Sequence, residues 1–269
     1  MKAKITLGIS LMIALGTTLG LLPLLLQQGE AVIRETVTRE KQQAPIAATA
    51  ASGNNVYVVW NSNKTGNWDI MFRASTDGGN MFDDKINLSN TSSGRSDMQS
   101  VAASGNNVFV IWCDDMSGEM EIYMKKSTDN GKTFGNATMI KSAGTLPTNI
   151  KYMPYSGQES DTITIDTRIA LSGNNTYASW WDNKTGNWEV LYARSTDAGE
   201  TFEDTINLSN SPTTDSTRSE LAANGNNVYL TWWETNQTSN APVMRVSNDN
   251  GSTFGPVLML AANGTIGRT

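Results

Sequence analysis

The sequence contains no histidine and only one cysteine among its 269 residues. The absence of histidine excludes Ser-His-Asp and Cys-His catalysis, and with a single cysteine it also excludes ordinary zinc sites. One cysteine cannot form an internal disulfide. No basic residue stands beside Cys113 in the sequence. We therefore expect a packed thiol there and not a nucleophile.

Basic residues are also scarce. Residues 1–44 carry five of the 20 basic and three of the 26 acidic side chains, so the rest of the chain has 15 basic and 23 acidic side chains and a net charge of −8. An acidic body argues against nucleic acid or anionic lipid as a partner.

The N-terminus has the pattern of a targeting segment. Lys2 and Lys4 precede an apolar run over residues 5–26, which predicts either a cleaved signal peptide or an N-terminal membrane anchor in residues 1–26. Residues 27–44 are polar and charged and are interpreted as a linker. Both alternatives place residues 45–269 outside the cytoplasm, in an extracellular or cell-surface location, with membrane contact only through the N-terminal segment.

One motif, Ser-x-Asp-x-Gly-x-Thr-Phe, occurs four times, with Met81 as its one departure at the Thr position. The four copies contribute Ser75, Asp77, Gly79 and Phe82; Ser127, Asp129, Gly131 and Phe134; Ser195, Asp197, Gly199 and Phe202; and Ser247, Asp249, Gly251 and Phe254. The motif serines are 52, 68 and 52 residues apart, and a period near 50 is typical of propeller or solenoid repeats. The repeats cover about 45–94, 95–142, 166–215 and 216–265, and an insert occupies 143–165.

Each repeat contains four short runs with strand composition. The strongest follows a Gly-Asn-Asn turn, as in Val56–Trp60, and is rich in β-branched and aromatic residues. Four antiparallel strands in about 50 residues have the size of one propeller blade. The sequence therefore predicts an all-β fold, a β-propeller built from four-stranded antiparallel blades, with four repeats.

The motif has a structural explanation that needs no ligand. Its Gly permits a backbone conformation that a Cβ would oppose. Its Asp accepts hydrogen bonds from nearby backbone N–H groups, and its Phe is placed to pack between neighbouring blades. We expect these residues to build the turn between the third and fourth strands.

The motif resembles the Asp-box, or bacterial neuraminidase repeat, of the sialidase superfamily, over residues 45–265. The resemblance implies a propeller whose Asp-boxes are structural turns on the side away from the active site. Sialidases close six blades, so four repeats are incomplete by comparison. The same motif occurs in propellers of other function, so fold alone does not assign an activity.

The resemblance also supplies candidate catalytic residues. Sialidases use a Tyr nucleophile, a Glu that activates it, an Asp acid/base and three Arg that clamp the substrate carboxylate, the first in an Arg-Ile-Pro motif. This chain lacks that motif, and its nearest match is Arg168-Ile-Ala, whose first position is Ala48, Ser100 and Glu220 in the other repeats. The adjacent insert contains Tyr155, Glu159 and Asp161. Arg168 and these three are candidate catalytic residues, while a polar surface loop has the same composition.

Two tryptophans stand outside the repeat pattern. Trp181 and Trp233 each follow the periodic Trp and therefore point to the opposite face of the strand. Exposed aromatic rings stack on sugars, so both are candidate ligand-binding residues.

Together these features favour a non-catalytic protein that recognises a glycan or a surface protein. A glycoside hydrolase of exo-sialidase type and a structural envelope or assembly protein remain alternatives. We expect no cofactor and no metal; calcium stays open, although Asp129 and Asp249 lack the alternate acidic ligands of an EF-hand. Four repeats either close alone, are completed in a homodimer, or form a shortened relative of a longer propeller.

Overall fold

The computed structural model describes residues 47–117, 120–140, 166–236 and 240–261, which belong to one compact unit, Lys41–Thr269. Within these residues the fold is all-β, with four four-stranded antiparallel sheets and no helix. No described segment forms a helix long and apolar enough to span a membrane. The N-terminal segment 1–26, the linker 27–44 and the insert 143–165 lie outside the described residues.

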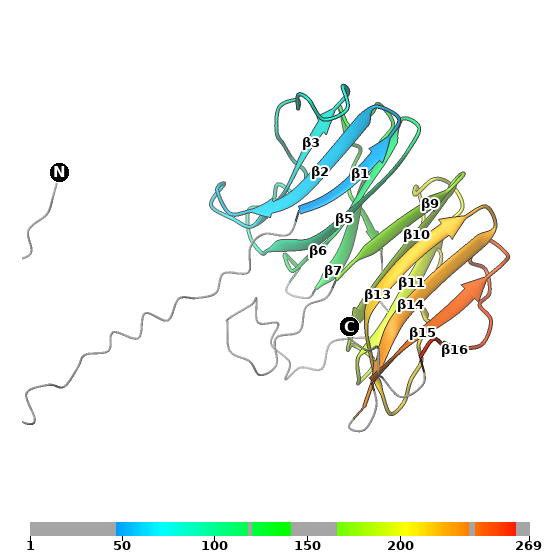
Figure 1. Cartoon of the computed structure of the whole chain (residues 1–269). Helices are drawn as coiled ribbons and strands as arrows, with labels where there is room; N and C mark the ends of the chain where they lie inside the picture. Colours follow the sequence, from blue (N-terminus) through cyan, green and yellow to red (C-terminus); the bar gives the residue numbers. More distant parts are fainter. Residues whose placement is uncertain (1–46, 118–119, 141–165, 237–239, 262–269) are drawn as a thin grey trace, which may run out of the picture. The chain divides into compact units, whose positions relative to one another are not determined.

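Each sheet is a simple meander of consecutive strands (Figure 1). The first sheet contains β1 (Ala47–Ser52), β2 (Asn55–Ser62), β3 (Asp69–Ser75) and β4 (Ile86–Asn87). The second contains β5 (Ser96–Ser104), β6 (Asn107–Asp114), β7 (Glu121–Ser127) and β8 (Thr138–Ile140). The third contains β9 (Arg168–Ser172), β10 (Asn175–Asp182), β11 (Glu189–Ser195) and β12 (Ile206–Asn207). The fourth contains β13 (Asp215–Asn224), β14 (Asn227–Thr235), β15 (Asn240–Ser247) and β16 (Leu258–Met259).

The first two strands of every sheet form a tight hairpin. In the first sheet Ser52 pairs with Asn55 across a two-residue turn, and Gly53 in that turn has φ of +60°. Glycine adopts this left-handed conformation without the steric cost of a Cβ. The Gly-Asn-Asn element of the sequence therefore sets the hairpin register.

The first strands of consecutive sheets lie side by side. β1 packs against β5, β5 against β9, and β9 against β13, whereas the short fourth strands lie at the far edges of their sheets. This is the arrangement of propeller blades, with the first strand of each blade innermost. The predicted fold class is therefore confirmed.

The core lies between consecutive sheets. Alternation along β2 points Tyr57 and Val59 toward the second sheet, where they pack with Val108, Val110 and Trp112 of β6. The opposite side of β6, which includes Phe109 and Ile111, packs with Ala178 and Trp180 of the third sheet. A third cluster joins Tyr177 and Tyr192 to Leu230 and Trp232 of the fourth sheet. The periodic tryptophans at 112, 180 and 232 are thus blade-packing residues.

Cys113 lies on the β6 face that packs against the third sheet and is fully buried. Burial, with the nearby carboxylates of Asp97 and Asp166, raises the pKa of its thiol well above the usual value. A neutral, enclosed thiol is a poor nucleophile. The prediction of a packed thiol is confirmed.

The four repeat turns, as we name the segments 75–82, 127–134, 195–202 and 247–254, share one hydrogen-bond pattern. The Ser hydroxyl accepts from the backbone N–H of the motif Gly at 2.8–2.9 Å and donates to Asp Oδ1 at 2.6–2.7 Å. In the last three turns the Asp also accepts from the Thr hydroxyl at 2.5–2.6 Å. In the first, Met81 offers only its backbone N–H.

These hydrogen bonds make the stability of the fold depend on pH. They favour the ionised carboxylates, and those from Ser127 and Ser195 head the causes that lower the pKa of Asp129 and of Asp197 from 3.8 to about 2. The pKa of Asp249 is also lowered, chiefly by hydrogen bonds from Thr253. A carboxyl group whose pKa is lower when folded stabilises the fold above its unfolded pKa, and this contribution is lost as pH falls through the folded value.

We therefore expect the free energy of unfolding to fall between about pH 4 and pH 2. Urea unfolding followed by circular dichroism at pH 5, 4, 3 and 2 measures this. A variant with Asp129→Asn, Asp197→Asn and Asp249→Asn should be less stable at pH 5 and show a smaller pH dependence. An equal pH dependence in the two proteins would contradict the role of the three carboxylates.

Candidate functional site

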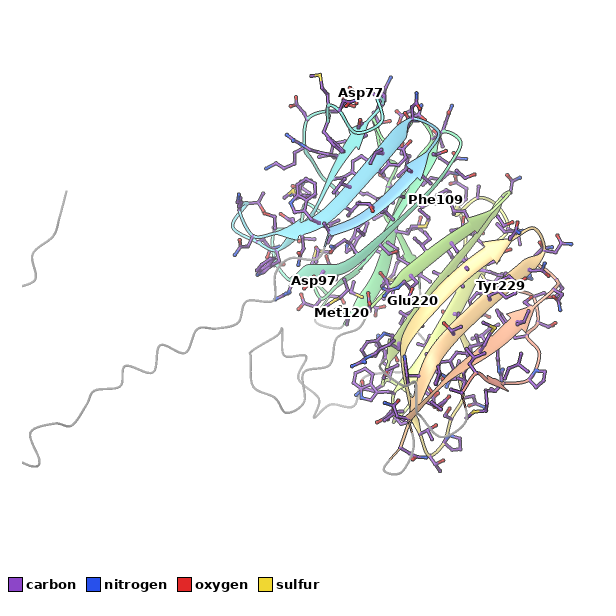
Figure 2. The ribbon with its side chains drawn as sticks, in the orientation of Figure 1. Asp77, Asp97, Phe109, Met120, Glu220 and Tyr229 are labelled. Atoms are coloured by element: carbon purple, nitrogen blue, oxygen red, sulfur yellow. The ribbon has the colours of Figure 1, made fainter. Side chains whose placement is uncertain are left out.

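The two ends of the sheets differ in chemistry. The repeat turns lie beside the hairpins between first and second strands, since the Gly78 amide donates to the Asn54 carbonyl at 2.8 Å. The opposite end, here called the loop end, holds the entries to β5, β9 and β13 and the loops between second and third strands. Figure 2 shows Asp77 of a repeat turn and Asp97 of the loop end far apart. The repeat turns satisfy their own polar groups, which leaves the loop end as the candidate site.

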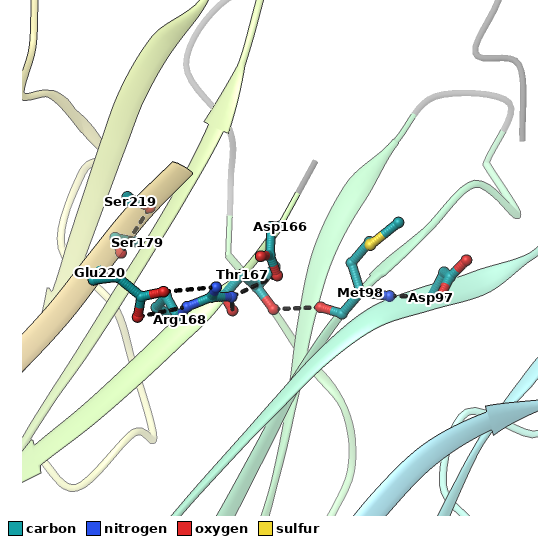
Figure 3. Close-up of polar contacts among 8 residues, drawn as sticks. All are labelled: Asp97, Met98, Asp166, Thr167, Arg168, Ser179, Ser219 and Glu220. Atoms are coloured by element: carbon teal, nitrogen blue, oxygen red, sulfur yellow. Dashed lines mark hydrogen bonds and ion pairs between the residues drawn. The ribbon is translucent and has the colours of Figure 1, made fainter. Parts of the chain in front are cut away.

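Arg168 begins β9 at the loop end and is held by two carboxylates. Its Nε and Nη2 donate to the two oxygens of Glu220 at 2.9 and 3.0 Å, and its Nη1 lies 2.5 Å from Asp166 Oδ1. Nη1 also donates to the Thr167 carbonyl at 3.0 Å. Figure 3 shows this guanidinium between the two acids. Every nitrogen of Arg168 is therefore already engaged.

The two acidic partners of Arg168 stabilise the charged form of its guanidinium. Burial alone would lower the pKa of the guanidinium, but hydrogen bonds and charge from Glu220 and Asp166 outweigh it and raise the pKa. A bidentate Arg–carboxylate pair is a strong, geometrically specific interaction. One cation faces two anions, so a further carboxylate would meet net negative charge.

The strands beside Arg168 are irregular. β5 and β13 have register shifts between Asp97 and Ser100 and between Thr217 and Glu220. Met98 and Arg218, at these shifts, have φ of +55° and +57°. The Thr167 hydroxyl donates to the Met98 carbonyl at 2.5 Å, which ties the second and third sheets together. Bulges of this kind re-aim side chains and are common near functional sites.

A second arginine at the loop end is also paired. Arg95 Nε donates to Asp97 Oδ2 at 2.9 Å, and its guanidinium lies 4.8 Å from the centre of the Trp68 ring. Asn61 donates to the other oxygen of Asp97 at 2.6 Å. Neither this cluster nor the Arg168–Glu220 pair was predicted from the sequence. The available signal was that Arg168 and Glu220 hold the same position in successive repeats, on inner strands that lie next to each other.

The remaining candidates have different surroundings. Tyr155, Glu159 and Asp161 lie outside the described residues. Trp181 is 7% exposed and packs edge-on against Trp188 at 5.5 Å. The expectation of an exposed ring is therefore wrong for Trp181, because the fourth sheet covers that face of β10. Trp233 is half-buried, and its role in ligand binding stays a prediction.

One shallow depression lies at the loop end of the third and fourth sheets. It has a volume of about 600 Å³ and is lined by Asn187, Pro212, Thr213, Thr214, Asp215, Thr235 and Asn236. Its amide, hydroxyl and carboxylate groups are hydrogen-bonding partners for sugar hydroxyls. Asn187 is held in place because its side-chain amide donates to the Ser211 and Thr214 carbonyls at 2.6 and 2.7 Å.

No family model and no curated protein matches this chain. Its structure is similar to a protein of unknown function from Dyadobacter fermentans, with a TM-score of 0.56 and 12% identity over 82% of this chain and 70% of that one. It is similar to the Trypanosoma rangeli sialidase, with a TM-score of 0.52 and 14% identity over 80% and 37% of the two chains. It is also similar to a family 25 polysaccharide lyase acting on ulvan, with a TM-score of 0.52 and 10% identity over 81% and 56%.

These likenesses show the fold, a sialidase-like β-propeller. The chain spans 45% of the length of a microbial sialidase that it resembles with a TM-score of 0.50, and less than two thirds of the length of the Trypanosoma sialidase and the lyase.

Proposed function

We propose that the chain is an exported or membrane-tethered, sialidase-like propeller that binds a glycan without cleaving it. The arrangement of Arg168 carries the non-catalytic part of this proposal. Its guanidinium is held bidentately by Glu220 and contacted by Asp166. A sialoside carboxylate would have to displace one of these acids, and the bidentate contact with Glu220 already occupies the geometry that a substrate clamp would use.

The repeat turns fit the proposal as Asp-boxes with a structural role. Their Ser, Asp and Gly groups bond one another, as in the Asp197 carboxylate, which accepts from Ser195 and Thr201. They lie at the end of the sheets opposite the loop end, which holds the depression. Export is supported by the basic start and the apolar run of residues 5–26.

A neutral glycan fits the loop end better than an anionic ligand does. Structural neighbours include a sialidase and a polysaccharide lyase, and the depression offers Asn, Thr and Asp side chains at its surface. The chain has a net charge of −6 and places Asp215 in the depression. Such surroundings repel an anionic sugar, so we propose a neutral oligosaccharide as the ligand.

The depression predicts which substitutions weaken binding. We expect the full chain to bind neutral oligosaccharides on a glycan array, and Asp215→Ala to weaken binding about tenfold, since hydrogen bonds to charged groups are the stronger ones. Thr213→Ala should weaken binding less. Calorimetry with the best array ligand measures both effects.

Ser93→Ala is the matched control, because Ser93 holds the position of Thr213 two repeats earlier and is likewise exposed. It should bind as the unmutated protein does. A blank array would overturn the glycan proposal. Turnover of a fluorogenic sialoside by the unmutated protein, lost in Arg168→Ala, would overturn the non-catalytic one.

A further inference from the structure

The outward face of the fourth sheet is exposed, although the equivalent residues of the other three sheets are buried by the sheet that follows. Tyr57, Phe109 and Tyr177 point toward the next sheet and are 0–3% exposed, whereas Tyr229 at the same repeat position is 37% exposed (Figure 2). Leu88, Ile140 and Leu208 are 1–2% exposed, whereas the equivalent Leu260 is 51% exposed. Trp233, Met244 and Val246 share this outward face with Tyr229.

The first sheet shows the converse pattern on the side where another sheet would precede it. Trp112, Trp180 and Trp232 are 0–2% exposed, whereas Trp60 is half-buried. Phe82 is 37% exposed, and Met81 beside it is 75% exposed. A Cβ at Gly79 would meet only its own sheet, at Val56, 3.9 Å away.

The internal junctions show what each face accepts. The repeat turn of the following sheet inserts its Phe against the preceding sheet: the Phe134 and Phe72 rings are 4.8 Å apart, and the Phe254 and Tyr192 rings 5.0 Å apart. The motif glycine fits the same surface, since a Cβ on Gly131 would lie 2.6 Å from Phe72 Cζ. Lys125 closes the first junction by donating to the Leu88 carbonyl at 2.8 Å. In the open faces the equivalent residues are Phe82, Gly79 and Arg73 on one side, and Met244 and Leu260 on the other.

The two open faces are therefore complementary, because they are the two halves of a junction that the chain forms three times. Within the described residues, the first and fourth sheets do not share the packing that joins consecutive sheets. Covering an apolar surface of this kind lowers the free energy.

We propose that the outward face of the fourth sheet receives the first repeat turn of a second copy of this chain. The pairing is head to tail, so each copy offers one face of each kind. Two copies then close a ring of eight sheets, which is within the four to eight blades typical of propellers. Closure matters, because a head-to-tail contact that does not close produces open filaments. This inference does not depend on the glycan proposal, since the junction faces are separate from the depression.

The first test is the mass of the full chain, purified in detergent, by sedimentation equilibrium. We expect two chains per particle. Leu260→Asp should weaken the association about 30-fold or more, as expected for a residue at the centre of an interface. Ile206→Asp is the matched control, because Ile206 is 42% exposed on the outer strand of the third sheet and is not on either open face; it should leave the association unchanged.

The second test establishes the orientation. Phe82→Cys and Met244→Cys chains are prepared separately, mixed, and treated with a short bis-maleimide. We expect cross-linked dimers in the mixture and none in either variant alone; the buried Cys113 gives the background in the unmutated protein. A single chain per particle, more than two, or cross-linking of either variant with itself would overturn the proposal. Thermal unfolding by circular dichroism verifies that each variant is folded.

Discussion

Gly251→Ala is expected to lower the free energy of unfolding by about 3 kcal/mol. The four motif glycines hold the same position in their repeats, but their surroundings differ. Gly251 has φ of +74°, which costs an alanine about 1 kcal/mol or more. Its Cβ would also overlap the Tyr192 hydroxyl and lie 3.1 Å from Tyr177 Cε1. Both tyrosines are fully buried, so neither ring has room to move.

Gly79→Ala is the matched control for this change. Gly79 has φ of +89°, yet a Cβ there would have only Val56 within 4 Å, at 3.9 Å. We expect this variant to lose only the backbone cost of about 1 kcal/mol. Urea unfolding at a concentration that keeps chains separate compares the two variants. Equal losses would show that backbone conformation alone makes the motif glycine necessary.

Asp69→Ala is expected to cost about 3 kcal/mol, because it removes a buried carboxylate that accepts several hydrogen bonds. Asp69 is 2% exposed and accepts from the Thr65 hydroxyl at 2.7 Å, the Asn87 amide at 2.8 Å and the Ser89 hydroxyl at 3.1 Å. The Thr91 backbone N–H also donates to it at 3.1 Å. Burial alone would raise the pKa of Asp69, but these hydrogen bonds lower it, so the carboxylate is ionised at neutral pH.

The position itself does not require an acid. Ala241 holds the same place in the fourth repeat and is buried there. The expected cost of Asp69→Ala therefore comes from the donors of the first sheet that lose their partner. Asp84→Ala, at an exposed carboxylate of the same repeat, should stay within about 0.5 kcal/mol of the unmutated protein. A loss below about 1 kcal/mol for Asp69→Ala would mean that water replaces the carboxylate.

Sequence reasoning predicted the site less well than the fold. It selected Arg168 because the residue is singular among the repeats, but the bidentate pair with Glu220 depends on two inner strands being side by side. It also treated Trp181 and Trp233 as equivalent, since both follow a periodic Trp. Their environments differ because a fourth sheet covers Trp181 and the described residues include no fifth sheet to cover Trp233.

The sequence by itself determined the repeat unit. A fixed spacing between hairpin turn, strand and Ser-x-Asp-x-Gly turn specifies four antiparallel strands, because each signal is local and acts within about 50 residues. Tertiary structure decided which residues of equivalent repeats are buried. Identical positions in the repeats are buried in three and open in one, since burial is a property of the neighbouring sheet and not of the residue. That difference distinguishes Leu260 from Leu88 and Gly251 from Gly79.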